Sequence, residues 1–386
     1  MLRTLLVGFG RAGAGLHWQV LRQLRGSDEA AGLFATEPSV VFDTGDARAR
    51  ATRDGLTVVD SLSQAARILD PATTVVHLCV PPAARLAALT EVAALGFTRL
   101  LAEKPLASDV DALRGIAQVC RDYSLQLVPV AQWLRSALTL RLRELIDTGE
   151  LGRLRTINIV QRKSRLSRTL LDAGHPTAFD VELPHSVGLV LGLAGDASVT
   201  DAAWADMHVG DVVIPRMGMA RLRLDHHSGP VTEIFSELTS PVRERRIDLT
   251  FDEGRVIGHY PNSEADHYAH LVVTAGARRN ASVLFDDSLR AFFLDTYRRF
   301  AAGDDLREDL SLGRRVVEVL HEAKRIAGRV EQGAAGATHP TDASVRTGSA
   351  DRTATASGMA NTVGMLNSAG MAGTPLLAER TAGYVR

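Results

Sequence analysis

The sequence has 386 residues, of which 45% are hydrophobic and 23% are charged, and its formal net charge is −1. This length predicts two or three domains with full hydrophobic cores, and the balanced charge excludes a general attraction to nucleic acid or to anionic membranes. The lack of an apolar run of roughly 18 residues, of a cleavable signal peptide and of metal-type cysteine spacing favours a reduced, cytoplasmic protein without membrane partners.

The first predicted element is a strand over residues 2–7, which runs into a glycine-rich turn and a helix over about 12–24. Its glycines follow the G-x-G-x-x-G spacing. The first allows a tight turn, the second lets a pyrophosphate approach the backbone, and the third lets the helix pack closely on the strand. The helix N-terminus offers N–H groups to the anion. The motif predicts a dinucleotide site made of Gly8, Phe9, Gly10, Arg11, Ala12 and Gly13.

An acidic residue, Asp43, follows the second predicted strand, 39–42. It lies 30 residues beyond Gly13, although the usual interval from the motif is about 20 residues, so a long helix or loop must intervene. A carboxylate at this point binds a ribose 2′-hydroxyl and repels a 2′-phosphate. We therefore expect NAD in preference to NADP, even though Arg48 and Arg50 follow nearby. The alternative is an ordinary turn with an exposed aspartate.

Strands and helices then alternate up to about residue 130. The run TTVVHLCV at 73–80 is typical of a central parallel strand that is buried on both faces. We therefore predict an α/β domain over residues 1–130, with a doubly wound parallel (Rossmann) sheet whose ligands bind beyond the carboxyl ends of the strands. The remaining strands of this sheet are predicted at 56–59, 99–102 and 126–130.

One lysine lies on the same rim of the predicted sheet, in the triplet Glu103-Lys104-Pro105. The chain has 44 basic residues, and only Lys104, Lys163 and Lys324 are lysines. Arginine does not titrate in proteins, whereas a buried lysine can shift its pKa and act as a donor or acid. We therefore expect a chemical role for Lys104, and the alternative is a surface lysine after a strand.

Beyond residue 131 the pattern changes to a helix at 139–148 and a series of strand-like segments. This predicts an α+β domain over 131–330 with a large, mostly antiparallel sheet that serves substrate binding and oligomerisation. Residues 331–386 are rich in Gly, Ala, Thr and Ser, and we expect a disordered tail there. The strand-like segments are 154–162, 198–207, 217–224, 231–238, 245–251 and 255–259, followed by helices at 288–302 and 312–329.

GFGRAG after the first strand, EKPL after the fifth, the sheet-rich second domain and His185 together resemble the glucose-fructose oxidoreductase / inositol dehydrogenase / MocA family. The resemblance covers roughly residues 1–330. It implies a homo-oligomeric (dimeric or tetrameric) oxidoreductase that uses NAD or NADP on sugars, cyclitols and related alcohols. It also implies that Lys104 contacts substrate and nicotinamide, that His185 transfers a proton, and that Pro81 and Glu103 line the cofactor. The alternative for Glu103 is that it structures the turn or pairs with a neighbouring cation.

Two positions depart from the family pattern. Many members have an aspartate four residues before the histidine, where this chain has Val181, flanked by Asp180 and Glu182. The family's Pro-Asn-x-x-His after the fourth strand reads Pro-Pro-Ala-Ala-Arg here, which places Arg85 at the position of the histidine. These departures suggest a divergent subfamily and leave open which residues form the proton relay.

The chemistry of His185 suits a general base, because an unperturbed imidazole titrates at about pH 6.5. Pro184 favours the first turn of a helix, and the helix dipole there keeps the ring neutral. Glu182 is a candidate to orient that ring, and Lys104 would hydrogen-bond the reacting oxygen. The alternative is a structural histidine that caps or packs.

Two further residues complete the predicted substrate set. His175 follows Gly174 in a loop and either lines the pocket or is a solvated loop histidine. Lys163 either reaches a polyol or a phosphate or is a charged strand end. We predict no metal, because the remaining histidines show no convergent metal spacing.

The leading hypothesis is an NAD(P)-dependent oxidoreductase that acts on a hydroxyl or carbonyl group of a sugar, amino sugar or cyclitol. A second enzymatic hypothesis is reduction of an imine or another carbonyl, with Lys104 as the main donor. A third hypothesis, from a different functional class, is that the chain is a non-catalytic dinucleotide or sugar sensor on the same fold. Turnover with NAD and a panel of polyols separates the enzyme from the sensor.

Overall fold

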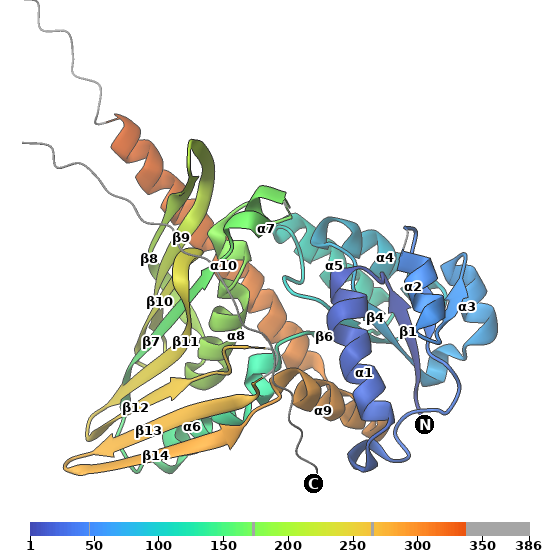
Figure 1. Ribbon diagram of the computed structural model, residues 1–386, viewed down its shortest axis with the longest axis horizontal. Coiled ribbons are helices and arrows are strands. Elements are labelled where there is room, and N and C mark those ends of the chain that lie inside the picture. Colours follow the sequence, from blue (N-terminus) through green and yellow to red (C-terminus); the bar gives the residue numbers. More distant parts are fainter. Residues whose placement is uncertain (46, 172–173, 264–265, 337–386) are drawn as a thin grey trace, which may run out of the picture. The chain divides into compact units, whose positions relative to one another are not determined.

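The computed structural model describes residues 1–45, 47–171, 174–263 and 266–336 (Figure 1). No helix within these ranges is both long and apolar enough to cross a bilayer. The helices are α1 (Trp18–Arg25), α2 (Ala47–Arg53), α3 (Leu62–Ile68), α4 (Pro82–Ala94), α5 (Val110–Asp122), α6 (Ala137–Thr148), α7 (Leu166–Leu171), α8 (Leu183–Ala194), α9 (Ser288–Ala302) and α10 (Arg307–Gly336). The strands are β1 (Arg3–Val7), β2 (Val40–Phe42), β3 (Thr57–Val59), β4 (Thr74–Leu78), β5 (Arg99–Ala102), β6 (Gln126–Pro129), β7 (Leu154–Ser164), β8 (Ala197–Val209), β9 (Val212–His226), β10 (Val231–Glu237), β11 (Thr239–Phe251), β12 (Gly254–His259), β13 (Tyr268–Ala275) and β14 (Arg278–Phe285).

The first six strands form a parallel sheet in the order β3-β2-β1-β4-β5-β6. Every residue of β4 is buried, as expected for a strand covered on both faces. The strand order reverses between β1 and β4, which is where ligands bind in sheets of this type. The predicted doubly wound α/β fold is confirmed.

The remaining strands form an eight-stranded sheet in the order β14-β13-β12-β11-β7-β10-β9-β8. Only β7 and β10 pair in parallel, so the predicted mostly antiparallel sheet is confirmed. The sequence analysis missed the hairpin of β13 and β14. Since β14 is an edge strand with mostly exposed side chains, its sequence lacks the apolar alternation that marks a half-buried strand.

The last two helices return to the parallel sheet. The aromatic face of α9, which carries Phe293, Tyr297 and Phe300, shares a core with β1 and α1. Helix α10 packs on the second sheet through residues such as Val316 and on the other face of the parallel sheet through Val317. The predicted 312–329 helix is part of a longer one that ends at Gly336. The expected disorder of residues 331–336 was therefore wrong, because these residues continue α10, and residues 337–386 of the predicted tail lie outside the described ranges.

Candidate active site

The glycine turn after β1 is built so that two of its glycines cannot be replaced. Gly8 has a φ of +92°, and a Cβ there would lie 3.2 Å from the backbone carbonyl of Cys79. A Cβ on Gly13 would lie 2.1 Å from the oxygen of Gly8, which is far inside contact distance. At Gly10 nothing lies within 4 Å of the Cβ position. The packing of the chain therefore does not require Gly10, whereas the close approach of a pyrophosphate would.

Asp43 supports this turn directly. One of its carboxylate oxygens accepts the Phe9 N–H at 2.6 Å, and the other accepts the Gly45 N–H at 2.7 Å. The carboxylate thus joins the end of β2 to the glycine turn. Arg48, on the following helix, donates to the carbonyl of Val59 at 3.1 Å and pairs with Asp60. Gly10, Asp43 and the start of the helix after the turn together fit a dinucleotide, whose pyrophosphate and ribose they would hold.

Arg85 is buried, and it occupies the position at which the family that the sequence resembles has a histidine. Its guanidinium donates to the carbonyl of Val80 at 2.8 Å and to that of Leu106 at 3.2 Å, and it also bonds to the carbonyl of Pro105. Arg85 therefore braces the Lys104–Leu106 turn against the loop that contains Pro81. The sequence analysis noted Arg85 at this position but assigned it no role.

Lys104 follows β5 and reaches the second part of the chain. Its Nζ atom donates to the carbonyl oxygen of Val181 at 3.0 Å, and the Lys104–Pro105 bond is cis. Burial lowers the pKa of Lys104, and the charge of Glu103 opposes that effect. The ammonium group is thus held next to the segment that leads into the helix of His185.

His185 lies in the first turn of α8, as its position after Pro184 predicted. Its ring stacks on Trp133, with centroids 5.7 Å apart and planes at 22°, and Trp133 stacks in turn on Tyr260. Burial lowers the pKa of His185 well below its usual range, and the charges of Lys104, Arg245 and Lys163 add to this. The imidazole is therefore neutral at pH 7 and can accept a proton.

Each of the three lysines of the chain contacts a different residue of the tripeptide Asp180-Val181-Glu182. Lys104 binds the Val181 carbonyl, Lys163 pairs with the Glu182 carboxylate, and Lys324 pairs with the Asp180 carboxylate. The Asp180 carboxylate also accepts the N–H and hydroxyl groups of Thr177. Because the described partner of Glu182 is Lys163, its orientation of the His185 ring stays a prediction.

His175 is half-buried in the connection between α7 and α8. It lies two residues after positions 172–173, which are outside the described ranges, and its contact with substrate stays a prediction.

A buried polar chain runs beneath the glycine turn, and sequence reasoning missed it. His17 contacts Glu103 through Nε2 at 2.8 Å and His77 through Nδ1 at 2.7 Å. The Nε2 atom of His77 lies 2.8 Å from the Tyr297 hydroxyl, which lies 2.8 Å from the hydroxyl of Thr4. A histidine inside the apolar strand TTVVHLCV was the one available signal, because a buried polar side chain requires a partner.

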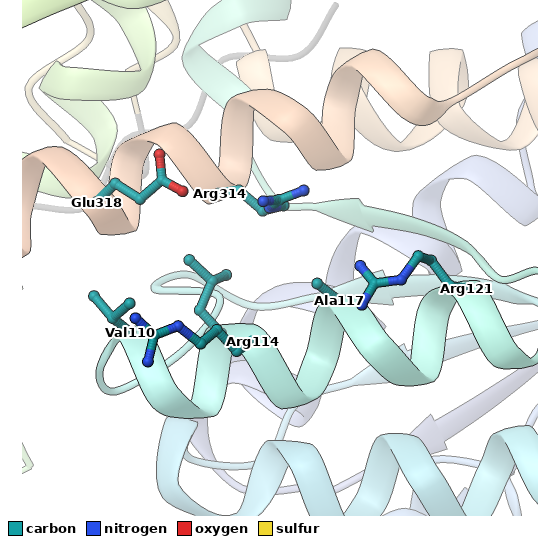
Figure 2. A pocket seen from close by; sticks show the side chains of 7 residues that line it. Val110, Arg114, Ala117, Arg121, Arg314 and Glu318 are labelled. Atoms are coloured by element: carbon teal, nitrogen blue, oxygen red, sulfur yellow. The ribbon is translucent and has the colours of Figure 1, made fainter.

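A cavity of about 280 Å³ lies elsewhere, between α5 and α10 (Figure 2). None of the predicted site residues lines it. Within the described ranges there is also no group of three or more His, Cys, Asp or Glu side chains arranged to hold a metal ion. The cavity is lined by Val110, Leu113, Arg114, Ala117, Arg121, Arg314 and Glu318.

Neither a protein-family model nor a curated protein sequence matches the chain. Solved structures do match it. A provisionally assigned NADPH-dependent oxidoreductase from Desulfitobacterium hafniense has a TM-score of 0.73 and 15% identity, covering 85% of this chain and 96% of that one. A 3-ketoreductase from Actinomadura kijaniata, in complex with NADP and TDP-benzene, has a TM-score of 0.68 and 16% identity, covering 84% and 97%. An oxidoreductase from Agrobacterium radiobacter, in complex with NAD+, L-tartaric acid and magnesium, has a TM-score of 0.69 and 13% identity, covering 85% and 97%. At these identities the likeness establishes a shared two-sheet fold.

Proposed function

We propose that the chain is an NAD(P)-dependent oxidoreductase that transfers a hydride between a nicotinamide cofactor and a hydroxyl or carbonyl carbon of a sugar or cyclitol. The observation that carries the proposal is the contact between the Lys104 ammonium and the Val181 carbonyl. It brings a cation from the rim of the parallel sheet next to the segment that precedes His185. The similar folds described as oxidoreductases, with NADP or NAD+ bound in two of them, support the same reaction class.

The glycine turn would hold the pyrophosphate of the cofactor, and Asp43 its ribose. When bound, a nicotinamide cofactor accepts the hydride from the alcohol or supplies it to the ketone. For oxidation, the neutral imidazole of His185 accepts the hydroxyl proton while the hydride leaves the carbon. The ammonium of Lys104 hydrogen-bonds the same oxygen and stabilises the negative charge that develops on it. In the reverse direction His185 returns the proton.

We further propose NAD rather than NADP as the preferred cofactor. The carboxylate of Asp43 lies at the end of β2 beside the glycine turn, and a carboxylate there repels a 2′-phosphate. Arg48 is already engaged by Asp60 and by the Val59 carbonyl, so it is not a ready phosphate ligand.

NADH fluorescence tests the proposal when the protein is mixed with NAD and a panel of sugars and cyclitols. We expect turnover with at least one member, and loss of that turnover in Lys104→Met with cofactor binding retained. Cofactor binding without turnover across the panel would contradict an enzyme and support the sensor.

A further inference from the structure

His17, on the helix that follows the glycine turn, contacts Glu103, the residue that precedes Lys104. His17 ends a π-helical turn, Gly13–His17, that begins at the last glycine of the motif. Its side chain has no solvent exposure, yet both ring nitrogens meet polar partners, Glu103 on one side and His77 on the other. The Glu103 carboxylate belongs to the residue next to Lys104.

The arrangement of protons along this chain follows from its partners. Burial alone would lower the pKa of His17, but Cys79 and the Glu103 carboxylate reverse that effect and raise it to about 10. Burial and the charge of His17 lower the pKa of His77 well below its usual range. These shifts favour an imidazolium at His17 that donates one N–H to Glu103 and the other to a neutral His77, which would donate in turn to Tyr297.

The chain of hydrogen bonds that starts at Glu103 ends at Tyr297 and Thr4. Tyr297, on α9, and Thr4, on β1, are both buried, so the path has no exit to solvent at this end through which a proton could be exchanged. An apolar pair in place of His17 and Glu103 could fill the same space without the cost of burying charged groups. Packing alone therefore does not explain why the pair is charged. The charge of His17 is therefore best explained by its effect on Glu103 and on the neighbouring Lys104.

We propose that His17 is a positioning residue for the reaction: it holds the Glu103 carboxylate beneath the glycine turn and so sets both the orientation and the electrostatic surroundings of the Lys104 ammonium. The inference rests on the proposed function of Lys104. The His17 cation compensates the Glu103 carboxylate, which otherwise would act on Lys104 as a full negative charge. The π-helical turn also makes this support part of the helix that receives the cofactor.

Other charges face the same groups and are unchanged by substitutions at His17. Arg85 acts on Glu103 from the start of α4. Besides Glu103, the charged groups that affect the pKa of Lys104 are Arg11, Arg165 and Asp180. The charge of Lys104 in turn lowers the pKa of Lys163 and of His185.

Because the chain has only three lysines, the pKa of Lys104 can be measured directly. Protein labelled with ¹³C at the lysine Cε gives three side-chain signals, which Lys163→Arg and Lys324→Arg assign. We expect His17→Gln to raise the titration midpoint of Lys104 by about one pH unit or more, a tenfold change in its protonation equilibrium, because Glu103 is then uncompensated. We expect Glu103→Gln to lower the midpoint, because the nearest negative charge is removed.

The control is Tyr297→Phe, which removes a hydroxyl from the same buried chain and leaves the charges near Lys104 intact. It should leave the Lys104 midpoint in place. Shifts of His17→Gln and Glu103→Gln in the same direction, or no shift in either, would overturn the proposal. If His17→Gln does not fold, His17→Asn takes its place: a higher Lys104 midpoint supports the proposal, and an unchanged or lower one overturns it.

Turnover of the unsubstituted protein is measured separately with the sugar and cyclitol panel. A protein that turns over substrate but shows no opposite shifts retains the proposed function and loses the role of His17. A protein that binds cofactor and never turns over loses the proposed function whatever the lysine signals show.

Discussion

The Nζ atom of Lys104 lies 3.0 Å from the carbonyl oxygen of Val181, and this hydrogen bond joins the end of β5 to the segment that precedes His185. The two residues are 77 positions apart in the chain. The ammonium of Lys104 is thereby held beside the segment that leads to His185, and its positive charge lowers the pKa of that histidine.

Replacement of Lys104 by Met should lower kcat/KM by about 10²–10³-fold, since this is the usual effect of removing one donor that stabilises developing negative charge. The affinity for NADH should change by no more than a few-fold, because the glycine turn is untouched. Steady-state kinetics and fluorescence titration measure the two quantities. Comparable losses in both would show that Lys104 serves binding and not the chemical step.

Replacement of His185 by Gln should lower the rate of alcohol oxidation by about 10²–10⁴-fold, the usual contribution of a general base. Because the pKa of His185 is well below 6.5 in the folded protein, the unsubstituted protein should keep its oxidation rate at pH 6.5. The rate should fall only at more acidic pH, where the imidazole becomes protonated. A pH profile of kcat/KM checks this, and an acid limb centred at or above pH 6.5 would contradict the assignment.

Asp43→Ser should weaken the preference for NAD over NADP. Removal of the carboxylate removes the repulsion of a 2′-phosphate, so kcat/KM with NADP should rise relative to that with NAD by about tenfold or more. The ratio of the two kcat/KM values is the measurement. An unchanged ratio would show that Asp43 only holds the Phe9 and Gly45 amides.

Gly10→Ala and Gly13→Ala form a matched pair within the glycine turn. Nothing lies within 4 Å of the Gly10 Cβ position, so Gly10→Ala should change the free energy of unfolding by less than about 1 kcal/mol and should weaken cofactor binding. At Gly13 the added Cβ would lie 2.1 Å from the Gly8 oxygen, and the forced shift should cost about 1–3 kcal/mol or more. Thermal unfolding and NADH titration separate the two effects. Normal cofactor affinity in Gly10→Ala would argue against a pyrophosphate at this turn.

The buried imidazolium of His17 should make stability depend on alkaline pH. Its pKa is about 10 in the folded protein against 6.5 as the ordinary value, so the folded state binds the proton more tightly. The resulting stability is fully present below pH 6.5 and is lost as the pH rises toward about 10. Melting temperatures of the unsubstituted protein should therefore fall over this range more steeply than those of His17→Gln. Parallel curves for the two proteins would show that His17 is a neutral imidazole and not an imidazolium.

The sequence determined the features that depend on neighbouring residues. Apolar runs with strand or helix periodicity identified the six parallel strands and most of the second sheet, because burial of one face or of both imposes that period. The glycine spacing located the turn after β1, since only glycine fits the backbone at Gly8 and Gly13. The scarcity of lysine drew attention to Lys104 before its surroundings were known. The edge strand β14 was not predicted, because a strand with mostly exposed side chains has no alternation of apolar and polar residues.

Only the tertiary structure decided which side chains meet. The three lysines reach Asp180-Val181-Glu182 from positions 77, 19 and 144 residues away from their partners. His17 meets His77 and Glu103 across 60 and 86 residues, and His77 meets Tyr297 across 220. Contacts of this kind depend on how whole layers pack, and no local pattern encodes that packing. For the same reason Arg85, which stands in place of an expected histidine, is recognised as a brace for the Lys104 turn only once the fold is known.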